Sequence, residues 1–243
     1  MIFHMNIYER KLKIRSIDVG MDRRLRLSVL LSLIQESAIA HTEELGMGRC
    51  KTLDKGLLWI VSMESIRIVR LPEYDEEVTL RTWPGKTMHL LFPRYFELRD
   101  ETGTPIVRAS AIWSLIDEKT RALIFPEKHG IMIEGEESGE ELSLPTPIRA
   151  LPCMHSRTFT VPYSFIDLNG HMNNTRYADL AEDCIHEDTR KYAIQSLRLE
   201  FLHEVKLGEM LSLSWGNEGG KWFLMGALDR PCFRMEMTFE PDP

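Results

Sequence analysis

The chain has 243 residues and a formal net charge of −7, with 43% hydrophobic and 28% charged residues. This length suits one large domain or two of ordinary size, and the composition is typical of a soluble globular protein. The acidic balance disfavours nonspecific binding to nucleic acid, which needs a basic surface, and no run approaches the ~20 apolar residues of a membrane span.

Residues 1–125 are predicted to form a strand, a long helix and four antiparallel strands. The N-terminal stretch MIFHMNIYERKLKI is too polar for a signal peptide and has an early acidic residue, Glu9, so we expect a cytoplasmic protein. Apolar residues recur at helical spacing between Leu25 and Leu45, and two glycines follow. Alternating apolar residues bounded by turn residues predict strands at 6–17, 57–69, 77–83, 90–99 and 106–116.

Residues 126–152 differ in composition and are predicted to be a linker that crosses the surface. The segment is rich in proline and carries an acidic run from Glu134 to Glu141. Such a charge run is typical of a solvated connection.

Residues 153–243 repeat the order of elements found in the first part. A strand at 157–163 leads through a polar loop to a helix at about 174–191, and strands are predicted at 196–206, 210–216, 221–228 and 232–239. We therefore predict two copies of one α+β unit, each an antiparallel sheet wrapped around a long helix. Only the second copy has a loop rich in acid, amide and imidazole side chains. We therefore expect the second copy to carry out catalysis and the first copy to supply the binding surface for the substrate.

That loop lies within VPYSFIDLNGHMNNTRY, from Val161 to Tyr177. If it is extended, alternate side chains point the same way, and a carboxylate, amides and an imidazole face one spot before a helix N-terminus. Helix N-termini carry free N–H groups and partial positive charge, which suits a developing oxyanion. A plainer interpretation stays open, in which the loop is a polar surface turn whose asparagines cap the helix. The polar residues are Asp167, Asn169, His171, Asn173 and Asn174.

Several separate motifs follow one another along nearly the whole chain. IDLNGHMNNTRY is similar to the pattern D-x-N-x-H-x-N-N. LLWIVSMESIRIVRLPEYDEEVTLRTWP is similar to a pattern of an L-x-W strand, a P-x-x-D-x-V turn and strand, and a T-W ending. RASAIWSLID and LRLEFLHEVKLGE are similar to an R-A-S-x-x-W strand and an L-x-L-E-Y-x-x-E-C strand. In this order the motifs resemble those of the acyl-acyl-carrier-protein thioesterases, the plant FatA/FatB type and its bacterial relatives.

The resemblance implies a tandem double hot-dog fold without a cofactor. It also implies hydrolysis of the thioester between a fatty acyl chain and the phosphopantetheine arm of acyl carrier protein, which ends fatty acid elongation. The family's catalytic Asp, Asn, His and Glu fall on Asp167, Asn169, His171 and Glu204. Glu204 would then act on the attacking water, and Asp167 would hold the network or share the role of base. His171 would donate to the carbonyl oxygen or the departing sulfur, and Asn169 would fix His171 or the water.

Substrate contacts are expected from both copies. The helix N-terminus near Asn173 and Asn174 would stabilise the oxyanion. The predicted strand at 57–69 would form the wall of an apolar slot for the acyl chain, although ordinary core packing also explains its composition. The wall residues with this expected role are Trp59, Val61 and Met63.

Neither a thiol nucleophile nor a metal is expected. Plant members of the family often carry a cysteine right after the catalytic Glu, and here Val205 stands at that place. The four cysteines lie far apart, which argues against a zinc site or a disulfide scaffold. The Asn-rich loop lacks the three well-placed ligands of a catalytic zinc site.

Three other functions stay open. An acyl-CoA thioesterase has the same chemistry, and a local basic patch for the acidic carrier protein would distinguish the two. A non-catalytic acyl-binding module would need an effector segment, which we do not expect before Tyr8 or after Phe239. A hot-dog dehydratase uses a different His–Glu or His–Asp pattern. A homodimer of such chains also remains possible.

Overall fold

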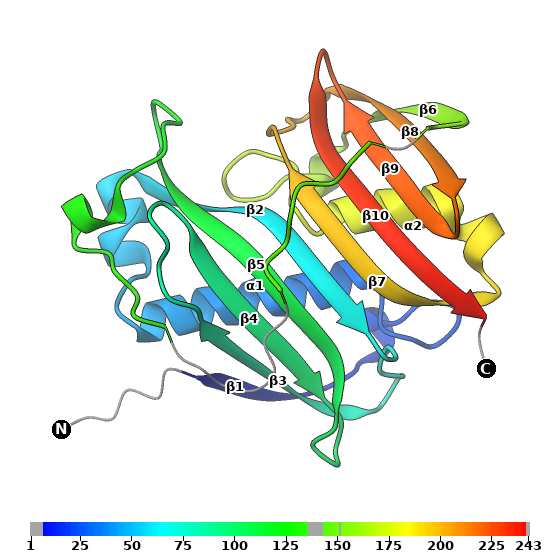
Figure 1. Cartoon of the computed structure of the whole chain (residues 1–243), viewed down its shortest axis with the longest axis horizontal. Coiled ribbons are helices and arrows are strands. Elements are labelled where there is room, and N and C mark those ends of the chain that lie inside the picture. The colour runs from blue at the N-terminus through cyan, green and yellow to red at the C-terminus, as the bar shows by residue number, and fades with distance from the viewer. Residues whose placement is uncertain (1–6, 136–142, 151, 242–243) are drawn as a thin grey trace.

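The strands of the chain join into a single antiparallel sheet. The computed structural model describes residues 7–135, 143–150 and 152–241. Within these ranges the strand order is β1-β3-β4-β5-β2-β7-β10-β9-β8-β6 (Figure 1). The first five strands in the chain are β1 (Tyr8–Lys13), β2 (Leu57–Ile68), β3 (Glu77–Pro84), β4 (Phe92–Arg99) and β5 (Pro105–Asp117). The other five are β6 (His155–Thr160), β7 (Tyr192–Phe201), β8 (Met210–Glu218), β9 (Lys221–Ala227) and β10 (Pro231–Pro241).

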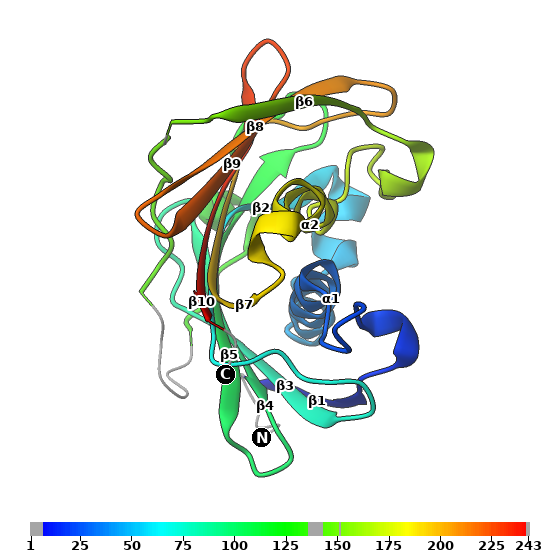
Figure 2. The ribbon, with the colours of Figure 1, turned by 90° about the vertical axis from the view of Figure 1, so that its right-hand side faces the viewer.

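Two long helices, α1 (Leu27–Glu44) and α2 (Arg176–Thr189), lie on the same face of this curved sheet, side by side (Figure 2). The buried residues of α1 recur three or four positions apart and form one apolar stripe, as helical periodicity requires. They are Leu27, Leu30, Leu31, Ile34, Ala38 and His41, with Ser28 and Ser37 beside them. The two helices therefore supply the core that the sheet wraps. No helix in the described ranges is long and apolar enough to cross a membrane.

The two halves meet at the pairing of β2 with β7. Residues 63–67 of β2 pair with residues 196–200 of β7 in antiparallel register. Among the described residues each half thus has one long helix and five strands, and the two sheets expected from the sequence are joined edge to edge. This arrangement is the tandem double hot-dog fold. It confirms the predicted fold class and leaves no open strand edge at the centre of the molecule.

Part of the predicted linker is well packed. The chain at 143–150 passes across the seam on the face opposite to the helices (Figure 1), where the Ser110 hydroxyl donates to the Ser143 carbonyl and the Ile148 N–H donates to Glu200. Ile131 and Ile148 are buried. The acidic run lies mostly outside the described residues. The limits 1–125, 126–152 and 153–243 stay a prediction.

One predicted strand is shorter than expected. The strand expected at 6–17 is β1, which ends at Lys13, and a 3-10 turn follows at Ser16–Asp18. The turn is closed by Asp18, whose carboxylate accepts hydrogen bonds from the backbone and the guanidinium of Arg15. Local side-chain pairing therefore overrides the alternating pattern here.

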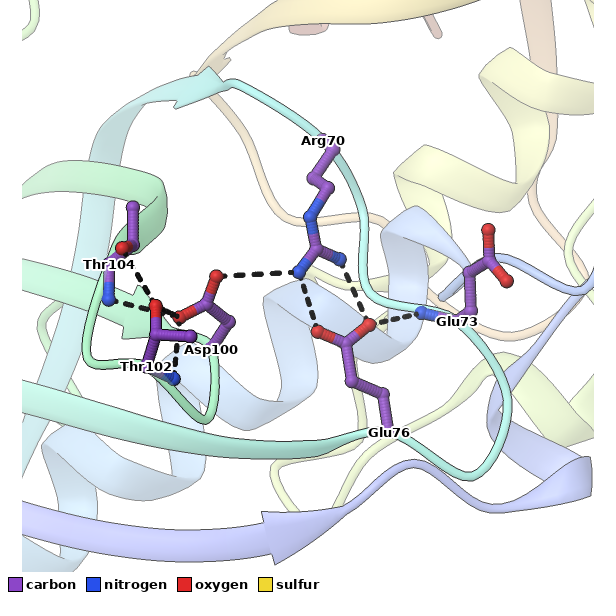
Figure 3. Close-up of polar contacts among 6 residues, drawn as sticks. All are labelled: Arg70, Glu73, Glu76, Asp100, Thr102 and Thr104. Carbon is purple, nitrogen blue, oxygen red and sulfur yellow. Dashed lines mark hydrogen bonds and ion pairs between the residues drawn. The ribbon is translucent and has the colours of Figure 1, made fainter.

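A polar cluster ties two connections of the first half together (Figure 3). Arg70, just after β2, makes two hydrogen bonds to the carboxylate of Glu76 at 2.9 and 2.7 Å and lies 3.6 Å from Asp100. Asp100 in turn accepts hydrogen bonds from Thr102 and Thr104 in the hairpin between β4 and β5. The β2–β3 turn and this hairpin are thereby held side by side.

Candidate active site

The loop after β6 closes into a tight turn at residues 167–171. The N–H of Asp167 donates to the carbonyl of His171 (2.8 Å), and the N–H of Gly170 donates to the carbonyl of Asp167 (3.1 Å). Gly170 has a φ of 78°, which glycine adopts without strain. The loop is thus a turn rather than an extended segment, so its polar side chains do not form the row that an extended chain would give.

The carboxylate of Asp167 is used inside this turn. Its Oδ1 accepts the N–H groups of Asn169 (2.8 Å) and His171 (3.3 Å). Asx residues commonly close turns in this way. Asp167 therefore orders the backbone that carries His171.

His171 and Glu204 come together from two separate connections of the second half, the one before α2 and the one after β7. His171 Nε2 lies 3.2 Å from Glu204 Oε2. The strand expected to run to Lys206 ends at Phe201, and the chain then turns toward the loop. The N–H of Met172 donates to the carbonyl of Val205 at 2.7 Å, and these backbone contacts with the loop place Glu204 beside the imidazole.

The other oxygen of Glu204 contacts an arginine of the first half. Arg121 forms an ion pair with Glu204 Oε1. It belongs to the turn after β5 and has a left-handed backbone, with a φ of 59°. Asp117 closes that turn by accepting hydrogen bonds from Thr120. One carboxylate thus joins both halves of the chain.

The surroundings of His171 favour its neutral form. Burial lowers its pKa below the ordinary 6.5, and the positive charges of Arg121 and Lys206 lower it further, while Asp167 and Glu209 oppose them. A neutral imidazole has one N–H and one lone pair. If Nε2 donates to Glu204, Nδ1 is left as the acceptor.

Asn173 and Asn174 lie at the start of α2. Asn173 Oδ1 accepts the N–H and the hydroxyl of Thr175, each at 2.9 Å. Asn174 is half-buried in the same turn, and α2 begins at Arg176. Asn173 therefore stabilises the turn before α2. This agrees with the interpretation of the loop as a polar turn that leads into the helix. A contact of either residue with a substrate stays a prediction.

A cavity of about 230 Å³ opens beside this site. Its wall combines Asn169 of the turn with residues of the first half from α1, the segment 48–53, β2 and β4. Trp59 lines it and packs edge-on against Phe92, with ring centroids 4.7 Å apart. Val61 and Met63 are not among the lining residues. The cavity thus runs from the polar turn into the first half.

No group of three or more His, Cys, Asp and Glu side chains within the described ranges is placed to hold a metal ion. Of the cysteines, Cys184 lies half-buried on α2, and burial raises the pKa of its thiol.

Two family models match the chain. Residues 5–127 match the acyl-ACP thioesterase N-terminal domain, and residues 151–222 match the acyl-ACP thioesterase C-terminal domain. The chain belongs to the acyl-ACP thioesterase family. The family suggested by the motifs is confirmed, and each half of the double hot-dog corresponds to one of its domains.

Individual members of the acyl-ACP thioesterase family are distant relatives. The palmitoyl-acyl carrier protein thioesterase of Cuphea hookeriana is 26% identical over 214 residues, which cover 82% of this chain and 52% of that protein. The chain thus spans about half the length of the curated relatives it matches. The acyl-ACP thioesterase of Bacteroides thetaiotaomicron superposes with a TM-score of 0.84 at 23% identity, covering 97% of this chain and 98% of the other. The 12:0-ACP thioesterase of Umbellularia californica gives 0.85 at 21% identity, covering 98% and 99%. At these identities the structures establish a shared fold.

The sequence did not reveal two arginines of this thioesterase-family site. Arg121 lies in a turn whose pattern indicates only a hairpin, and Arg94 lies on a strand whose neighbours are apolar. Both come close to the site through tertiary packing, so no spacing along the chain could have indicated them.

Proposed function

We propose that this chain hydrolyses the thioester of fatty acyl-acyl carrier protein, releasing a free fatty acid and ending its elongation. The observation that carries the proposal is the cavity that joins Asn169 of the polar turn to an apolar wall in the first half. A cavity lined largely by apolar side chains with a few polar groups suits an acyl chain, and the reactive carbonyl would lie beside the turn that carries Asn169.

In the proposed mechanism His171 is the base. Glu204 is paired with Arg121 through one carboxylate oxygen, and its other oxygen is placed to hold the imidazole Nε2–H. His171 Nδ1 then takes a proton from water as the water attacks the thioester carbonyl. Asn169, which lines the cavity, would donate from its amide to the carbonyl oxygen. The thiolate leaves and receives the proton from His171.

The carrier is acyl carrier protein in this proposal, and coenzyme A is the alternative. Family membership and the names of the relatives support the carrier protein. The net charge of −7 means that an acidic carrier would need a local basic patch. The cytoplasmic location and a possible homodimer stay predictions, as does the assignment of binding to the first half and catalysis to the second.

The test is a hydrolysis assay with acyl-carrier-protein and acyl-CoA substrates of graded chain length. We expect faster turnover of the carrier-protein thioesters, and Glu204→Ala should lower kcat/KM at least ~100-fold, the scale of losing an acid–base group. Glu218→Ala, at the exposed end of β8, is the matched control and should stay near the wild-type rate. Binding of acyl chains without hydrolysis of either thioester would support the non-catalytic module instead.

A further inference from the structure

The cavity opens to the surface between the polar turn and the segment 48–53. Asn169 of the turn and Arg49 and Leu53 of the segment line the cavity and are also exposed. Phe92 and Trp113 of the same wall are buried. The exposed lining residues therefore mark a mouth. An acyl chain that is tethered to a large carrier enters only through such a mouth, so the carrier must lie against the surface around it.

Connections from both halves form one continuous surface beside this mouth. The N–H of Glu118 donates to the carbonyl of Gly56 at 2.8 Å, which places the turn after β5 beside the segment that lines the mouth. Arg121 of that turn pairs with Glu204 in the connection after β7. This connection in turn pairs with the backbone of the polar turn. All of these segments lie in the upper half of the view in Figure 1 and in Figure 2.

Positive charge on this surface is left uncompensated. Its exposed lysines form no ion pair with a carboxylate in the described parts of the chain, and they are Lys51, Lys55, Lys119 and Lys206. Most acids beside them are already engaged by an arginine or by hydrogen bonds within a turn. The engaged acids are Asp54, Asp117, Glu204 and Glu209. Glu118 is exposed and opposes the four lysines, so the surface is locally basic although the whole chain has a net charge of −7.

Exposed leucines lie on the same connections as these lysines. They are Leu53, Leu123, Leu168 and Leu207, which are between 36% and 87% exposed. Apolar side chains that are exposed together and bordered by charges are typical of a protein-binding surface. Coenzyme A would contact only part of this surface, whereas a protein carrier covers the leucines as well as the lysines.

Resting on the function proposed above, we propose that these four lysines and four leucines are the docking surface for the acidic acyl carrier protein. The lysines meet acidic side chains of the carrier, and the leucines meet its apolar ones. Such charge complementarity steers the encounter and fixes how the partner is oriented. The phosphopantetheine arm of the docked carrier then passes the mouth beside Asn169 to reach His171.

The experiment compares one acyl chain on acyl carrier protein with the same chain on free pantetheine, which has no carrier to dock. The readout is the ratio of kcat/KM for the carrier-protein substrate over the pantetheine substrate. The double variant Lys55→Glu/Lys119→Glu should lower this ratio at least ~10-fold, because like charges then face each other in the complex. Lys11→Glu/Lys191→Glu makes the same change of charge on β1 and just after α2, and this control should keep the wild-type ratio.

Salt separates the charged part of the docking surface from the apolar part. Added salt should lower the ratio of the wild type and change that of the double lysine variant less, since salt screens exposed charges. Leu123→Ser should lower the ratio and keep its salt dependence, because it removes an apolar contact and no charge. A wild-type ratio in the double lysine variant, or an equal fall in its control, overturns the proposal.

Binding of the carrier without an acyl chain tests the docking surface without catalysis. Acyl carrier protein that bears only its phosphopantetheine arm should bind the wild type at least ~10-fold more tightly than the double lysine variant, as measured by isothermal titration calorimetry. If neither thioester is hydrolysed while this difference in Kd remains, the proposed function fails and the docking surface stands. If the carrier-protein thioester is hydrolysed and both proteins bind the carrier equally, the docking surface fails and the function stands.

Discussion

The carboxylate of Glu204 contacts a basic side chain from each half of the chain. His171 Nε2 contacts one carboxylate oxygen and Arg121 pairs with the other. Arg121 thereby fixes the orientation of Glu204, and its charge also lowers the pKa of His171. A residue of the first half thus contacts Glu204 and influences the pKa of His171 in the second half.

Replacing Arg121 tests its effects on the orientation of Glu204 and on the pKa of His171. Arg121→Gln removes the positive charge, so the pKa of His171 should rise and the acid limb of the pH–rate profile should move to higher pH. We also expect kcat to fall about 10-fold, because Glu204 loses a partner that holds it. The measurement is kcat/KM between pH 5 and 8. Arg190→Gln, exposed after α2, serves as control, and an unmoved acid limb in Arg121→Gln would exclude His171 as the base.

Two substitutions of Asp167 can show whether its carboxylate acts by closing the turn or by its negative charge. Its Oδ1 accepts two backbone N–H groups of the turn. Asp167→Asn keeps that oxygen as an acceptor and should retain activity within about 10-fold, whereas Asp167→Ala should lose at least ~100-fold because the turn opens. The measurement is the kcat/KM of each variant relative to the wild type. Equal losses would mean that the negative charge itself takes part in the reaction.

Residues close together in sequence were the easiest part of the site to predict. Asp167, Asn169 and His171 lie within five positions and share one turn. Glu204 was indicated by the family resemblance, because nothing local marks it. The contact of Arg121 with Glu204 and of Arg94 with α1 depends on how distant segments pack, and one sequence carries no signal for that.

At the scale of elements, helices and strands were predicted well where periodicity extends over several turns or residues. Both helices and all ten strands fall near their predicted positions. The main difference is β7, which ends at Phe201; the chain then turns, and Val205 and Lys206 pair with the backbone of the loop that carries His171. No proline or glycine interrupts residues 202–206, so a tertiary contact was needed to reveal the break.

The start of α1 also depends on a distant element. Its N-cap, Arg26, makes no side-chain capping bond, and the N–H of Leu27 donates instead to Glu182 of α2. Burial, with a contribution from Asp179, raises the pKa of Glu182 to about 7. The second half therefore caps the helix of the first.

Removing this cap should weaken the fold. At pH 6 the carboxyl of Glu182 is mostly neutral and still accepts the hydrogen bond, so Glu182→Ala should lower the free energy of unfolding by ~0.5–2 kcal/mol, the range of a lost helix cap. Urea denaturation measures it. Glu187→Ala, exposed on the same helix, should change stability by less than ~0.5 kcal/mol. A Glu182 variant as stable as the Glu187 control would show that the cap contributes nothing.

At the scale of the whole molecule, the sequence predicted a duplicated unit but could not show how the copies join. The seam is the pairing of β2 with β7, covered on one face by α1 and α2 and crossed on the other by residues 143–150 (Figure 2). Edge pairing uses backbone groups, which leave no mark on side-chain pattern. The cavity wall also forms only when distant elements of the chain pack together, namely α1, β2, β4 and the segment 48–53.

A buried acid lies at this seam. Glu64 of β2 is opposite Leu199 of β7 and is 6% exposed. Burial raises the pKa of its carboxyl from an ordinary 4.5 to about 7. A raised pKa means that the folded protein holds the proton more tightly, so the contribution of Glu64 to stability is complete below pH 4.5 and is lost as the pH rises toward and through 7.

Replacement by glutamine should therefore flatten the pH dependence of stability. Glu64→Gln keeps the shape and polarity of the side chain but cannot ionise, so between pH 5 and pH 8 the wild type should lose ~2–3 kcal/mol more unfolding free energy than the variant. Urea titrations of both proteins at several pH values measure this difference. Glu77→Gln, exposed on β3, should follow the wild-type curve. If Glu64→Gln followed it as well, the acid at the seam would have to be solvated, and the two halves would be less tightly joined than their strand pairing indicates.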